Sequence, residues 1–160
     1  MMKAKEIDII PTKDVFVGDP KAPVTLMEYG DYESEACAKV NEIVDKLLKQ
    51  FQGKMRFNFR HFPLTKVHQH AMKAAEASLG AAQEGKFWEM HTTLFANRRR
   101  LGAISLREYA KECGVINKKF LENLVDSTSW LASPQRPARR ARQGSSGRPG
   151  LLYQWRAFHR

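Results

Sequence analysis

Ser34 and Cys37 are the residues of this chain whose types and spacing point most directly to chemistry, and they lie in the stretch Ser34-Glu35-Ala36-Cys37. A strand-like run precedes the stretch and a helix-like run follows it, so it is predicted to begin a helix. Unpaired N–H groups and the positive end of the helix dipole favour a thiolate there and can lower the pKa of Cys37. The charge of Glu35 opposes that thiolate.

Ser34 has a simpler predicted role than nucleophile. Its hydroxyl has a far higher pKa than a thiol, and no base stands beside it in this segment. Serine is among the best N-cap residues of helices. We therefore interpret Ser34 as a cap and Cys37 as a half-buried thiol of modest reactivity.

Two strands joined by a helix are predicted to position these side chains. Val24–Tyr29 alternates like a strand, and the helix Glu35–Gln52 ends before Gly53, a usual helix terminator. Met55–Phe59 is predicted to pair parallel to the first strand through a right-handed crossover. The core-facing side of the helix is predicted to carry Val40, Ile43, Leu47 and Phe51.

The next part of the chain is predicted to be helical. Alanine-rich and amphipathic patterns place further helices at His68–Glu84, Phe87–Ala96, Ser105–Cys113 and Lys118–Val125, with Ser105 as a cap. Aromatic and sulfur side chains of the second of these are expected in the core, namely Phe87, Trp88, Met90 and Phe95. Cys113 is expected to be a free buried cysteine.

A set of motifs in this order resembles the DsbA-like branch of the thioredoxin superfamily, over residues 15–126. The motifs are Gly18–Thr25, Glu28–Glu33, Arg56–Leu64, Lys73–Ala77 and Gly85–His91. The resemblance implies an α/β, thioredoxin-like fold with the DsbA-type helical insert. Residues 1–14 would then form an N-terminal extension.

The chain departs from that family at its reactive centre and at its end. Where the family has Cys-Pro-x-Cys, this chain has Ser34 and Cys37, so two-thiol exchange is not available. The family's Val-Pro-x-Phe loop, with its cis proline, is also absent. The later strands and the final helix therefore have no counterpart, and the two predicted strands would lack a pairing partner on one side.

The composition changes abruptly at about Ser127. All 17 acidic residues lie at or before Asp126, so the chain up to there carries +3 of the net +10, and the arginine-rich tail, residues 127–160, carries +7. The tail has neither helical nor strand period and is predicted to be low-complexity and disordered.

A change of reading frame would account for this tail. Codons chosen for Gly147–His159 and read one base later encode Asp-Val-Pro-Gly-Phe-Phe-Ile-Asn-Gly-Glu-Pro-Phe, which resembles the missing loop and strand. We hypothesise a frame slip near Ser127. The alternative is a nucleic-acid-binding tail whose arginines alternate with Trp130, Tyr153, Trp155 and Phe158, and this reading ranks lower because the body contains no nucleic-acid module.

Several other classes of site are disfavoured. His68 and His70, with His61 or His91, have no ligands at zinc-like spacing, so surface or helix-capping roles are predicted and no cofactor is expected. Arg98–Arg100 is interpreted as a solvated loop. No run approaches the ~20 apolar residues of a membrane span, and the start lacks a secretory signal, so a cytoplasmic location is predicted.

Two function classes remain open. By ancestry the chain would be a thiol-disulfide oxidoreductase impaired in dithiol exchange, in which Cys37 forms mixed disulfides with protein thiols or disulfides. The alternative is a non-catalytic thioredoxin-like module that binds a peptide or a partner protein. The reactivity of Cys37 distinguishes the two.

Overall fold

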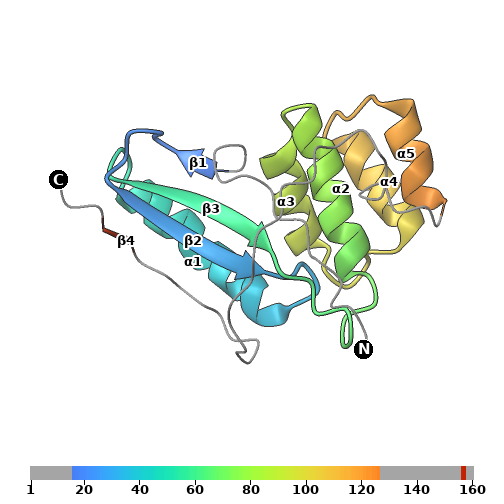
Figure 1. The fold of residues 1–160 in the computed structure, drawn as a ribbon, viewed down its shortest axis with the longest axis horizontal. Helices are drawn as coiled ribbons and strands as arrows, with labels where there is room; N and C mark the ends of the chain where they lie inside the picture. Colours follow the sequence, from blue (N-terminus) through green and yellow to red (C-terminus); the bar gives the residue numbers. More distant parts are fainter. Residues whose placement is uncertain (1–15, 127–155, 158–160) are drawn as a thin grey trace, which may run out of the picture.

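A small mixed sheet and five helices make up the part of the chain that the computed structural model describes, residues 16–126 and 156–157. The strands are β1 (Phe16–Gly18), β2 (Val24–Gly30), β3 (Met55–His61) and β4 (Arg156–Ala157). Their order in the sheet is β1-β3-β2-β4. Strands β2 and β3 are parallel, as predicted, while β1 and β4 run antiparallel to their neighbours (Figure 1).

Helix α1 (Glu35–Gln50) connects β2 to β3. It ends two residues sooner than predicted, where the N–H of Phe51 donates to Leu47 and Gly53 turns the chain with a φ of 77°. The predicted apolar face is confirmed in part, because Val40 and Leu47 pack against the core while Ile43 and Phe51 are 55% and 41% exposed. The fully buried positions of the helix are Cys37, Asn41 and Val44. A hydrogen bond to a buried histidine, described below, compensates for the burial of Asn41.

The helical insert comprises α2 (Ala71–Gln83), α3 (Phe87–Ala96), α4 (Ala103–Glu112) and α5 (Lys118–Val125). The four helices gather beside the end of the sheet where β2 and β3 finish (Figure 1). The predicted bounds of α3 and α5 are confirmed. Helix α2 starts at Ala71 and not at His68, because the residues before it form a turn. The predicted Ser105 cap is wrong, since Gly102 occupies the N-cap position of α4.

Aromatic side chains join the insert to the sheet. Phe57 and Phe59 of β3 are almost fully buried against rings of α3, including Trp88 and Phe95. Of the side chains predicted for the core, Phe87, Met90 and Phe95 are buried and Trp88 is partly buried. The indole N–H of Trp88 donates to the carbonyl of Phe16, 3.1 Å away, which ties α3 to β1.

Strand β4 corrects one expectation about the tail. The two central strands were predicted to have no partner on one side, yet β4 pairs with Val24 and Thr25. A two-residue ladder needs only backbone N–H and C=O groups, so an atypical tail sequence does not prevent it. The predicted extension 1–14 and the rest of the predicted disordered tail lie outside the described residues. Within the described part, no helix is long and apolar enough to cross a membrane.

Close packing of α2 on α5 makes Gly80 a sensitive position. A Cβ at Gly80 would lie 1.9 Å from Cε2 of Phe120. We predict that Gly80→Ala lowers the free energy of unfolding by ~1–3 kcal/mol, measured by urea titration, because overpacking forces the helices apart. Phe120→Leu should reduce that penalty in the double variant. Gly102→Ala is the control, because a Cβ there meets open space, and it should lower the free energy of unfolding by less than about 1 kcal/mol. Equal losses of unfolding free energy in both alanine variants would contradict the packing argument.

Candidate functional site

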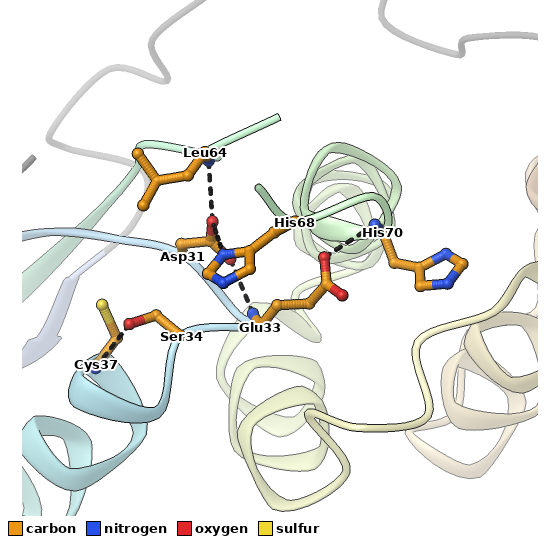
Figure 2. A network of polar contacts seen from close by, with 7 residues as sticks. All are labelled: Asp31, Glu33, Ser34, Cys37, Leu64, His68 and His70. Atoms are coloured by element: carbon orange, nitrogen blue, oxygen red, sulfur yellow. Dashed lines mark hydrogen bonds and ion pairs between the residues drawn. The ribbon is translucent and has the colours of Figure 1, made fainter. Parts of the chain in front are cut away.

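Ser34 occupies the N-cap of α1, as predicted. Its backbone is extended, with φ −70° and ψ 125°, and its Oγ accepts a hydrogen bond from the backbone N–H of Cys37 at 3.3 Å. The hydroxyl therefore satisfies one of the otherwise unpaired donors of the first helical turn. Strand β2 and the loop after it deliver Ser34 to this position, and α1 carries Cys37 one turn further (Figure 2).

Cys37 is more deeply buried than predicted. Its side chain faces the core and the residue is 6% exposed. Burial raises the pKa of the thiol, and the hydrogen bond with Ser34 lowers it only in part. A hydrogen bond with the backbone of Asp31 also lowers the pKa of Cys37, while the charge of Glu28, and to a smaller extent that of Asp31, raises it. The expected effect of the helix N-terminus is therefore outweighed, because desolvation penalises a thiolate more than the dipole stabilises it.

Glu28 is a site residue that the sequence reasoning missed. It is 1% exposed, and among the described residues neither carboxyl oxygen accepts a hydrogen bond of ordinary distance and angle, which leaves the nearby thiol of Cys37 as a weak donor. Burial raises the pKa of Glu28 to about 7, and the thiol of Cys37 lowers it in part. A buried acid beside a thiol can hold or accept a proton near neutral pH. The signal in the sequence that could have identified Glu28 is a glutamate at an inward-facing position of a predicted strand.

Asp31 anchors the loop between β2 and α1. Its carboxylate accepts from the backbone N–H groups of Glu33 and Leu64, each at 2.8 Å, and lies 2.8 Å from Nδ1 of His68 (Figure 2). The carboxylate of Glu33 in turn accepts from the backbone N–H of His70. His68 therefore holds the loop, and His70 contributes its backbone, without a side-chain cap bond to α2. Within the described ranges, no cluster of three or more candidate ligands for a metal exists.

A buried hydrogen-bond chain connects the site to the insert. The hydroxyl of Tyr32 lies 3.1 Å from Nδ1 of His91, and Nε2 of His91 lies 2.8 Å from Oδ1 of Asn41. Burial lowers the pKa of His91 to about 3, so the ring is neutral. Nε2–H then donates to Asn41, and Nδ1 accepts from Tyr32. The chain fixes α1 relative to α3, one turn beyond Cys37.

His61 lies in the same buried region on β3. Its Nε2 is 3.1 Å from the hydroxyl of Ser78 on α2, and burial lowers its pKa to about 3 as well. The surface role considered for His61 is therefore wrong. The reason is that Ser78 supplies a hydrogen-bond partner inside the core, where a neutral imidazole is tolerated.

Charged side chains of α1 and of the loop after α3 surround Glu35 in the first turn of α1. Arg98 lies 3.3 Å from Glu35, and Lys39 lies 3.0 Å from the same carboxylate. Lys39 first, and Arg98 next, hold the pKa of Glu35 below its usual value. Arg98 is therefore an ion-pair partner and not merely part of a solvated loop. Cys113 is half-buried, 3.6 Å from the hydroxyl of Thr93, and forms no disulfide with Cys37.

Residues 11–144 match the family model described as thioredoxin. BdbD from Bacillus subtilis is 27% identical, with a TM-score of 0.63 over 76% of this chain and 71% of that one. The thiol-disulfide exchange protein alpha-DsbA2 from Wolbachia pipientis shares the fold, at 18% identity and a TM-score of 0.59 over 71% of this chain and 59% of that one. The chain therefore belongs to the thioredoxin family, in its DsbA-like branch.

Part of a longer protein is also similar to this chain. The Na(+)/H(+) antiporter NhaA 1 of Salinispora arenicola is 39% identical over 120 residues, which are 75% of this chain and 18% of that protein. The chain thus spans about a fifth of the length of the curated relatives it matches. The similarity concerns a small portion of those proteins.

The raised pKa of Glu28 predicts a pH dependence of stability. The pKa is about 7 in the folded chain against an ordinary 4.5, so the stabilising contribution is complete below pH 4.5 and is lost as the pH rises through 7. Glu28→Gln does not titrate. Relative to the parent, this variant should gain on the order of 3 kcal/mol of unfolding free energy between about pH 5 and about pH 8.

Urea unfolding of both proteins at each pH measures this gain. His61 and His91 titrate in the opposite sense, because their lowered pKa values mean that stability is lost as the pH falls from 6.5 towards 3. Their effect cancels when variant and parent are compared at the same pH. A difference between the two proteins that stays constant with pH would show that Glu28 is ionised throughout.

Proposed function

We propose that this chain descends from a DsbA-like thiol-disulfide oxidoreductase and retains one of the two reactive positions. The observation that carries the proposal is the placement of Ser34 at the N-cap of α1, with Cys37 one turn inside and Glu28 beside it. The partners would be protein thiols or disulfides.

A single thiol supports half of the exchange reaction. The thiolate of Cys37 attacks one sulfur of a partner disulfide, a new S–S bond forms, and the other partner sulfur leaves as a thiolate. Glu28 is placed to take the proton that Cys37 gives up. Release of the bound partner needs a second thiol, and Ser34 offers only a hydroxyl. The mixed disulfide then persists until an external thiol attacks it.

A second candidate function is a non-catalytic module that binds a peptide or a protein partner. The burial of Cys37 and its raised pKa favour this candidate, because little thiolate forms near neutral pH. The antiporter activity in the name of the longer relatives belongs to those proteins, of which this chain matches about a fifth. The predicted cytoplasmic location and the disfavoured nucleic-acid role of the tail stay predictions.

We also propose that the reading frame slips near Ser127, since residues 127–160 carry arginines and no acidic residue. The nucleotide sequence of the gene tests this. A one-base shift that restores Val-Pro-x-Phe after that point is the expected result. If no single-base shift restores it, the tail belongs to the protein as such.

The reactivity of Cys37 separates the two candidate functions. In a Cys113→Ala background, we predict that Cys37 reacts with an aromatic disulfide reagent at least ~10-fold more slowly at neutral pH than in the urea-unfolded chain, because burial raises its pKa. Glu28→Gln should slow the reaction further, because the amide cannot take the proton that Cys37 gives up. A reaction in the folded chain as fast as in the unfolded one would exclude the non-catalytic reading.

Insulin reduction in dithiothreitol tests the loss of dithiol exchange. We expect the chain as written and a Ser34→Ala control to be inactive, because neither holds a second thiol at the site. A Ser34→Cys variant with the restored frame beyond residue 127 should be active. Activity of the chain as written would refute the claim that Ser34 abolishes exchange, and inactivity of the repaired variant would favour the binding module.

A further inference from the structure

The backbone of β2 has one edge that β3 does not use. The N–H of Val24 donates to Lys54 beside β3, and the carbonyl of Gly30 accepts from Phe62 on the same side. In a parallel ladder the N–H and C=O of one residue point to the same side, and successive residues alternate. Thr25, Met27 and Tyr29 therefore direct their backbone groups towards the opposite edge.

Strand β4 occupies only the beginning of that edge. It pairs antiparallel with Val24 and Thr25, and the described part of the chain offers no partner to the N–H and C=O groups of Met27 and Tyr29. Tyr29 is 37% exposed. The open stretch leads directly into the loop between β2 and α1 (Figure 1). An unpaired strand edge is a template for another strand.

We propose that the edge of β2 at Met27 and Tyr29 binds an extended peptide segment of a partner protein as an added antiparallel strand. The inference rests on the peptide-binding candidate above and specifies where the peptide lies. Backbone hydrogen bonds supply the affinity in this mode of recognition, and alternate side chains supply the selectivity.

The pairing of β4 with β2 supports both the antiparallel direction of the added strand and a peptide as the occupant of the edge. The same edge already accepts an antiparallel strand at Val24 and Thr25, so a peptide continues an existing ladder. A second copy of the chain fits less well. A symmetric β2–β2 pair centred between Met27 and Tyr29 sets Thr25, which β4 already pairs, opposite Asp31 of the other copy. A narrow peptide avoids that overlap.

The neighbouring side chains indicate the kind of peptide. Every second side chain of the added strand would lie beside Met27 and Tyr29 on one face of the sheet. Aromatic and β-branched residues pair well with such neighbours across strands. We therefore expect a peptide with valine, isoleucine or an aromatic residue at alternate positions.

Hydrogen exchange of single backbone amides tests the proposal. The probe is a short synthetic peptide of alternating valine and threonine, added to the full chain with Cys37→Ser so that disulfide chemistry plays no part. We expect exchange of the Met27 and Tyr29 amides to slow by at least ~10-fold, because ladder hydrogen bonds protect amides. A twin peptide, N-methylated where the ladder needs donors, should give no protection.

Other outcomes overturn the proposal. Equal protection by both peptides means that the ladder is not the binding mode, and no protection by either means that the edge does not take a peptide. If the Met27 and Tyr29 amides are already protected in the free protein, and that protection does not depend on protein concentration, the chain's own tail occupies the edge. If protection of these amides grows with protein concentration, a second copy of the chain occupies the edge. Failure of the mixed-disulfide chemistry leaves this result unaffected, because Cys37 is absent.

A variant provides a second measurement. Met27→Pro removes an edge N–H without removing a bond to β3, so it should abolish protection at Tyr29 by the peptide. Met27→Val keeps the N–H and is the matched control. If Met27→Pro binds the peptide as well as Met27→Val does, the edge is not the docking site.

Discussion

The buried chain from Tyr32 through His91 to Asn41 is the interaction on which the arrangement of the site depends. It joins the loop before α1, helix α3 and α1 itself at 3.1 and 2.8 Å. Each group would be costly to bury alone, and each is satisfied only when all three elements are in place. The depth of Cys37 below the surface follows from this placement, since Asn41 lies one turn further along the same buried side of α1.

Under the proposed ancestry, the hydroxyl at position 34 keeps the start of α1 intact but cannot take part in disulfide exchange. An N-cap needs a hydrogen-bond acceptor, and the Oγ of Ser34 serves that purpose towards the N–H of Cys37. Disulfide exchange needs a second sulfur, which no hydroxyl replaces. A chain without a dithiol at this place can therefore still build the helix, the loop anchored by Asp31 and the buried acid Glu28.

The electrostatics of the site come from burial more than from charge pairs. Glu28 and Cys37 both have raised pKa values for that reason, and His61 and His91 have lowered ones. The low polarity around these four groups favours their neutral forms. Exposed pairs such as Glu35 with Lys39 modulate the rim, where solvent screens them.

The sequence by itself determined the strand-helix-strand core, the Ser34 cap and the bounds of α3 and α5, because those features follow from short-range periodicity and capping chemistry. It predicted only part of the buried side of α1, since Val40 and Leu47 pack against the core but Ile43 and Phe51 do not, and the burial of Asn41 depends on a hydrogen bond from His91, 50 residues away. The reversed pKa direction of Cys37 and the buried place of Glu28 were likewise decided by tertiary packing. Desolvation depends on neighbours distant in the chain, and no local pattern encodes them.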